Sequence, residues 1–233
     1  MSGSRLFDIL RLVGGGVCHQ LPDRSLHLAG TSLPLCARCT GTYLGAAAAI
    51  VTILLLRRER ASLLPSWPVL SLFAASFLAW GIDGLNSYLT LFPGAPHLYE
   101  PTNALRLLTG TLQGLALTLV IWPVAAFTLW RSPRRDRLIH AGELGLCASG
   151  ALAVAALSIR GVPAALVAAG VLSVLGLVAL FVLLNLMVLA VALHRDGTLG
   201  GARDLLPLLG LSALAATVEL GALSLLRHCL LGF

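Results

Sequence analysis

The residues best suited to chemistry lie near the start of the chain, where Cys18 and His19 are followed by Cys36 and Cys39. Three of the five cysteines thus fall within 22 residues. Thiolates and imidazoles are preferred ligands of zinc, and a Cys-x-x-Cys pair commonly supplies half of such a site. The pattern therefore predicts a site for zinc or another thiophilic divalent metal, with these three thiols as ligands and His19 or His97 as the fourth.

Two other interpretations of the thiols stay open. Cys36 follows Pro34 at the start of a predicted helix, where the helix dipole lowers a thiol pKa, as in thiol–disulfide oxidoreductases. In an oxidising compartment Cys18 would be the resolving thiol for the Cys-x-x-Cys pair, and a quinone would accept the electrons. Alternatively, the cysteine cluster is purely structural and only orders the N-terminal segment.

A second group of polar residues lies between two long apolar segments. Asp83 falls near the end of the second segment, Arg106 near the start of the third, and Glu100 in the loop between them. A charge at the centre of a membrane helix costs about 2.5–3.5 kcal/mol, so such residues pair or line a wet cavity. We expect Asp83 and Arg106 to lie within hydrogen-bonding or one-water reach, with Glu219 as the alternative partner of Arg106.

These polar residues have a structural and a catalytic interpretation. An internal ion pair would only fasten helices together. As catalytic residues, Asp83, Glu100 and Arg106 would surround a metal-activated water, with Glu100 or Asp83 as base, acting on a lipid or lipid-linked substrate. The residue pattern does not decide between an enzyme and a binding or structural protein.

The composition is that of a membrane protein, since 58% of the residues are hydrophobic, 11% are charged and the mean hydropathy is +0.91. A bilayer core of about 30 Å takes roughly 20 apolar residues per helix. The formal charge of +6 does not indicate nucleic-acid binding, because the basic residues form short clusters between apolar runs. We predict an all-α integral membrane helix bundle with six spans, at residues 35–56, 67–89, 103–130, 138–159, 162–193 and 205–226.

The distribution of arginine predicts the orientation. Nine arginines fall in the loops expected after the first, third and fifth spans, and such charge favours the cytoplasmic side. This predicts a multi-pass protein of the cell membrane with both termini extracytoplasmic. Four arginines of the N-terminal part, Arg5, Arg11, Arg24 and Arg38, argue the other way.

The chain divides into two parts. Residues 1–34 are predicted to form an interfacial, extracytoplasmic segment that begins with an amphipathic helix and carries part of the Cys/His site. Residues 35–233 are predicted to form a single six-helix transmembrane domain. The expected partners are membrane lipids and a lipid-linked or quinone substrate; no sequence feature indicates an oligomeric state.

Small residues are expected to pack the helices. Residues 41–45 and 110–114 are both Gly-x-x-x-Gly, a spacing that is common in membrane helices and lets two backbones approach closely. Cys147 and Cys229 lie far in the sequence from the cysteine cluster and are expected to be buried small apolar residues.

The motifs together resemble those of a prokaryotic family of small polytopic membrane proteins of unknown function. They are Cys-His-Gln at 18–20, Cys-Ala-Arg-Cys-Thr-Gly at 36–41, Asp-Gly at 83–84 and Asn-Ala-Leu-Arg-Leu-Leu-Thr-Gly at 103–110. The resemblance extends to about Gly114, and the rest of the chain matches only as apolar helices. It implies a membrane location and groups these motifs, without implying a reaction.

Overall fold

The computed structural model describes residues 2–92 and 94–231, with side chains described for residues 7–92 and 94–230. The side chain of Arg5 and the last two residues of the predicted membrane domain lie outside the described part. Within the described residues, six helices are long and apolar enough to cross a membrane, which confirms the predicted all-α bundle. They are α2 (Ala37–Leu55), α3 (Trp67–Leu89), α4 (Asn103–Leu129), α5 (Ala141–Ile159), α6 (Pro163–Ala192) and α7 (Ala202–Leu231).

The remaining elements are short and lie at the two ends of the bundle. Helix α1 (Ser2–Gly14), the 3₁₀ turn η1 (Pro22–Arg24) and the antiparallel pair β1 (His27–Leu28) and β2 (Thr31–Ser32) precede the first long helix. The parallel strands β3 (Ala61–Leu63) and β4 (Arg134–Arg137) follow α2 and α4.

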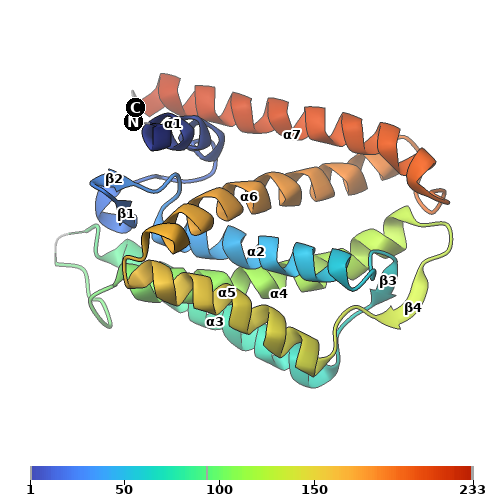
Figure 1. The fold of residues 1–233 in the computed structure, drawn as a ribbon, viewed down its shortest axis with the longest axis horizontal. Coiled ribbons are helices and arrows are strands. Elements are labelled where there is room, and N and C mark those ends of the chain that lie inside the picture. The colour runs from blue at the N-terminus through green and yellow to red at the C-terminus, as the bar shows by residue number, and fades with distance from the viewer. Residues whose placement is uncertain (1, 93, 232–233) are drawn as a thin grey trace.

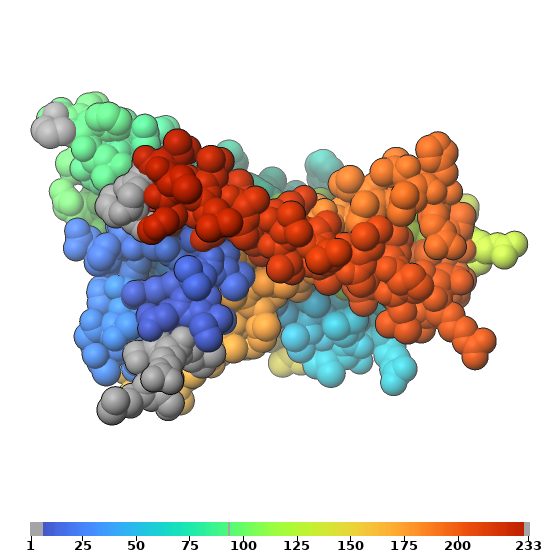
Figure 2. Space-filling view, turned by 90° about the horizontal axis from the view of Figure 1, so that it is seen from above, coloured from blue at the N-terminus to red at the C-terminus, as the bar shows by residue number. Residues whose placement is uncertain are grey.

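The long helices run roughly along the molecule and define two ends (Figure 1). Helix α1 packs beside the C-terminal part of α7 at one end, here called the termini end, together with β1 and β2 (Figures 1 and 2). Strands β3 and β4 lie at the opposite end, called the arginine end because it carries the arginine-rich loops after α2, α4 and α6.

Helix α2 is central and packs very closely on α4. Gly41 and Gly45 of α2 face the α4 backbone, while Gly110 and Gly114 of α4 face the α2 backbone. A methyl group at any of these four positions would overlap a carbonyl oxygen of the facing helix, so the two Gly-x-x-x-Gly motifs pack on one another. Close helix packing at these glycines was predicted, whereas the pairing of the two motifs is a finding of the structure. Gly176 of α6 meets α2 in the same way. This packing fixes the first turn of α2 beside the first turn of α4.

The two isolated cysteines differ in burial. Cys147 of α5 is 7% exposed, as expected, and packs in an apolar cluster between α2, α3, α4 and α5. Cys229 is exposed, which corrects the prediction. Helix α7 packs mainly against α6 and α1, so much of its surface, including Cys229, is not covered by the rest of the chain.

Candidate functional site

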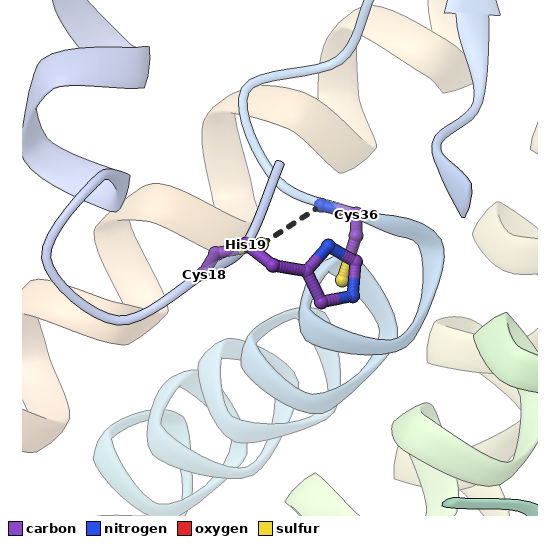
Figure 3. A group of neighbouring side chains, drawn as sticks. All are labelled: Cys18, His19 and Cys36. Carbon is purple, nitrogen blue, oxygen red and sulfur yellow. Dashed lines mark hydrogen bonds between the residues drawn. The ribbon is translucent and has the colours of Figure 1, made fainter. Parts of the chain in front are cut away.

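Three metal-ligand side chains converge at the termini end. Cys36 is the N-cap of α2, and its backbone N–H donates to Sγ of Cys18 at 3.2 Å (Figure 3). The ligand atoms of Cys18, His19 and Cys36 all lie within 4.8 Å of one another. Both cysteines are buried, whereas His19 is exposed. The group can therefore hold an ion at the boundary between the packed bundle and its surroundings.

Cys39 lies one turn further along α2, next to this group. It is partly buried and packs with Cys18, Cys36 and Val174. Hydrogen bonds from the thiols of Cys18 and Cys39 hold the pKa of Cys36 well below its usual range. The same contact with Cys36 raises the pKa of Cys18. Without a metal, the three sulfurs therefore favour one thiolate, on Cys36, stabilised by two neutral thiols.

Gln20 brings Cys18 and His19 to the start of α2. Its backbone has a φ of +50°, and its side-chain amide donates to the carbonyl oxygens of Arg11 and Pro34 at 2.9 Å each. These bonds tie the end of α1 to the chain just before Cys36. The Gln of the Cys-His-Gln motif thus positions the ligand-bearing residues.

Arg227, near the end of α7, also holds the segment that carries Cys18 and His19. Its guanidinium donates to the carbonyl oxygens of Gly15 (2.9 Å), His19 (2.8 Å) and Cys18. A guanidinium with several carbonyl acceptors holds a backbone turn in a fixed shape. From the sequence, this arginine was counted only for the orientation of the chain in the membrane. The one sequence signal of a further role is that a charged residue lies close to the end of an apolar helix, where its insertion is costly.

His19 is already hydrogen-bonded to the backbone. Its Nδ1 accepts from the N–H of Leu21 at 3.1 Å, which places the proton of the neutral ring on Nε2. A metal at Nδ1 would take the lone pair that accepts this bond, and a metal at Nε2 would require a proton on Nδ1. Ligation by either nitrogen therefore breaks the Leu21 bond.

His97 and Glu100 are not brought into the thiol group. His97 Nε2 and Glu100 Oε1 are 2.9 Å apart, and the Glu100 side chain is 87% exposed. The hydrogen bond with Glu100 raises the pKa of His97 above its ordinary value. Asn86 fixes the loop between His97 and Glu100, since its Oδ1 accepts from the Leu98 N–H and its Nδ2 donates to the Tyr99 carbonyl.

The direct partner of Asp83 is Arg38, and none of the described hydrogen bonds or ion pairs joins Asp83 to Arg106. The Arg38 guanidinium bonds both the carboxylate and the carbonyl oxygen of Asp83. The Tyr99 hydroxyl donates to the other carboxylate oxygen at 3.0 Å. Asp83 is only 1% exposed. Arg38 is the partner because it lies in the first turn of α2, between the two cysteines, and its side chain extends from there to α3.

Arg106 and Glu219 have other partners. The Arg106 guanidinium donates to the hydroxyl of Ser87 and to the side-chain oxygen of Asn103. Glu219 accepts from the Asn185 amide at 2.8 Å, between α6 and α7. Glu219 is thus not the partner of Arg106, and the polar group at the termini end consists of residues from α2, α3, α4 and the loops beside them.

A cavity of about 620 Å³ lies elsewhere in the bundle, between α2, α4, α6 and α7. Its lining is mostly apolar, with Glu59 and Arg60 at the arginine end. None of its lining residues belongs to the thiol group. The cavity is therefore separate from the thiol group.

Comparison with known proteins extends the motif resemblance. A family model described as "Predicted membrane protein (DUF2085)" matches residues 18–120. The resemblance is confirmed over this part of the chain. The matched region begins at Cys18 and includes Cys36, Cys39, Asp83 and Arg106. It supports a multi-pass membrane protein and says nothing about a reaction.

Two archaeal proteins are similar over shorter stretches. An uncharacterized protein of Methanocaldococcus jannaschii, MJ1492, is 26% identical over 109 residues, which are 46% of this chain and 63% of that protein. An uncharacterized protein of Methanothermobacter thermautotrophicus is 50% identical over 30 residues, which are 13% of this chain and 27% of that protein. The chain thus matches less than two thirds of the length of either relative. No solved structure matches.

Proposed function

We propose that this multi-pass membrane protein binds a thiophilic divalent metal ion, with zinc as the best match, between Cys18, His19, Cys36 and Cys39. The observation that carries the proposal is the convergence of three ligand atoms within 4.8 Å. Neighbouring ligand atoms of a tetrahedral zinc site lie about 3.3–3.8 Å apart, so a small contraction completes the geometry. A set rich in thiolates disfavours magnesium and calcium, which prefer oxygen.

The protonation pattern of the thiols agrees with this proposal. Cys36 already favours its thiolate, stabilised by the thiols of Cys18 and Cys39. A divalent cation would replace the protons on the two neutral thiols and the Leu21 hydrogen bond of His19. Metal binding then releases protons and contributes directly to folding free energy.

Cys39 decides what kind of metal site forms. With Cys39 as the fourth ligand the site is closed and structural; with water there it is open and supplies an activated nucleophile. The open form would act on a lipid or lipid-linked substrate, since the group lies at the end of a membrane bundle. Arg38 and Tyr99 occupy the carboxylate of Asp83, so Asp83 would orient Arg38 instead of acting as a base. Glu100 is bonded to His97 outside the thiol group, so it is not positioned as the base either.

A second candidate function is thiol–disulfide oxidoreduction. All five cysteines are free, and three of them lie together with one favouring its thiolate. In this reaction a thiolate of a substrate dithiol would attack a disulfide between Cys36 and Cys18 or Cys39, which leaves the substrate as a disulfide and the protein as a dithiol. The two electrons and two protons released by the dithiol would reduce a quinone to a quinol.

Elemental analysis together with a count of free thiols tests the proposal. We expect about one zinc-like ion per chain, lost with a drop in thermal stability in Cys36→Ser. Cys147→Ser, which changes another buried cysteine, should keep both the metal and the thermal stability. Metal-free protein with a reversible disulfide involving Cys18 or Cys36 would favour the oxidoreductase. Metal-free protein with five reduced, unreactive thiols would leave only a structural role.

A further inference from the structure

Three guanidinium groups gather beside the thiol group at the termini end. They bond side chains along the C-terminal part of α3, since Arg38 contacts Asp83, Arg106 contacts Ser87 and Arg24 contacts Thr90. Arg38 forms an ion pair with Asp83. Among the described residues, neither Arg24 nor Arg106 has a carboxylate within ion-pair distance. Even with Cys36 as a thiolate, the cluster therefore carries an excess positive charge.

Arg106 shows this imbalance most clearly, because it is only 6% exposed. Its Nε and Nη2 donate to the Ser87 hydroxyl at 3.1 and 2.9 Å, and its Nη1 donates to Asn103 Oδ1 at 2.8 Å. All these acceptors are neutral. A buried ion is costly without an opposite charge, and neutral acceptors offset only part of that cost.

Arg38 contributes an unused donor to the same place. Its Nε is buried and has no hydrogen-bond partner among the described residues. Buried donors are almost always satisfied, so an orphaned one points to a missing acceptor. An acceptor that also carries negative charge would satisfy Arg38 Nε and offset the charge of Arg106.

Asn103 builds the frame that holds the arginines together. Its Nδ2 donates to the carbonyl oxygens of Asp23 and Ser25, on either side of Arg24, at 3.1 and 3.2 Å. Its Oδ1 accepts from Arg106. One side chain thus sets the position of Arg24 relative to Arg106, at the N-terminus of α4, where the helix dipole adds positive potential.

The cluster is reachable from outside the bundle. Arg24 is partly buried, and its only described side-chain bond is a long one, 3.4 Å, to the Thr90 hydroxyl. The Arg38 side chain is 17% exposed. An anion can therefore approach along Arg24 and reach the buried guanidinium of Arg106.

We propose that Arg24, Arg38 and Arg106 form a binding site for a phosphate group. Guanidinium forks match the several oxygens of a phosphate and pair with it bidentately. The phosphate belongs either to a lipid headgroup or to a small soluble anion. The site is separate from the metal site, because none of the three arginines offers a metal ligand, and it stands whichever way the thiols function.

Binding to the purified full-length protein in detergent tests the site with two probes, inorganic phosphate and a short-chain phosphatidic acid. We expect saturable binding by calorimetry, and a rise in thermal stability that equal ionic strength of sodium chloride does not reproduce. Equal binding of both probes would identify a soluble anion as the ligand, and binding of the lipid alone would identify a headgroup.

The variants Arg24→Gln and Arg106→Gln should weaken this binding by about tenfold or more. Arg160→Gln removes an exposed arginine from the α5–α6 connection at the same end and should leave binding unchanged. If Arg106→Gln fails to fold, Arg24→Gln still decides, because Arg24 is only partly buried. No saturable binding of either probe, or unchanged binding in Arg24→Gln, would overturn the proposal, whatever the metal content of the protein.

Discussion

The guanidinium of Arg38 forms an ion pair with the carboxylate of Asp83, joining the first turn of α2 to the last part of α3. Arg38 lies between Cys36 and Cys39, so this pair also sets how α2 presents its thiols. The Tyr99 hydroxyl completes the shell around Asp83. A side chain that is 1% exposed depends on these partners to hold a charge.

Breaking this pair should destabilise the protein strongly. Asp83→Asn leaves the Arg38 guanidinium without its counter-charge, and loss of one partner of a buried pair typically costs about 3–5 kcal/mol. Asp136→Asn is the matched control, because Asp136 pairs with Arg134 at 2.8 Å while both side chains are more than half exposed. Exposed pairs contribute about 0–1 kcal/mol. Equal losses of thermal stability in the two variants would show that the Arg38–Asp83 pair contributes no more to stability than an exposed ion pair.

The close contact of α2 with α4 should be intolerant of a single methyl group. Gly114→Ala would place its Cβ against the Thr42 carbonyl, and overpacking of this kind costs about 1–3 kcal/mol or more. Gly145→Ala in α5 meets no atom within 4 Å and should be neutral or slightly stabilising, since alanine favours helix. Thermal unfolding in detergent measures the stability of the two variants. Similar stability of both variants would contradict the packing of the two Gly-x-x-x-Gly motifs.

The spans were predictable because membrane insertion depends on a one-dimensional property, the run of apolar residues. The predicted span 67–89 and helix α3 have the same limits. The partner of Asp83 was not predictable in this way, since it depends on how α2 is rotated about its axis. Arg38 entered the prediction as a charge for orientation and as part of the motif at 36–41, without an assigned partner.

The candidate site was partly predictable for a similar reason. Cys36 and Cys39 share a helix turn, so their proximity follows from spacing alone. The position of Cys18 and His19 beside them depends on the path of the linker, which Gln20 and Arg227 determine through bonds to backbone carbonyls. Arg227 is 208 residues from His19 in sequence, and no local pattern connects them.

The predicted orientation can be tested with the exposed thiol of Cys229 near the end of α7. Because the arginine-rich loops favour the cytoplasm, a membrane-impermeant maleimide should label Cys229 in intact cells. A cysteine introduced at the arginine end by Arg135→Cys, in a Cys229→Ser background, should react only after the cells are permeabilised. The reverse pattern would place both termini in the cytoplasm and remove the oxidising environment that the redox alternative requires.

His97 should titrate at a higher pH than an ordinary histidine. The hydrogen bond with Glu100 raises its pKa, because the carboxylate favours the protonated ring. The contribution of the pair to stability is therefore present at pH values below the ordinary pKa and is lost as the pH rises through the raised one. An NMR titration of the His97 ring measures the shift. In Glu100→Gln the pKa should fall, and an unchanged value would show that the pair does not form.

Arg227 should act on the metal site by position alone. It contacts no ligand atom of the thiol group but donates to the carbonyl oxygens of Cys18 and His19. Arg227→Gln should therefore leave the metal stoichiometry unchanged while weakening affinity by about tenfold, as is typical when a group that orients a metal ligand is lost. Competition with a chelator measures the affinity, and Arg227→Lys, which keeps a charged donor, should recover part of it. Arg203→Gln, at the opposite end of α7, is the control that should change nothing. Complete loss of the metal in Arg227→Gln, despite normal folding, would mean that the segment around Cys18 and His19 is not preformed. Unchanged affinity would mean that Gln20 alone is sufficient to hold that segment beside Cys36.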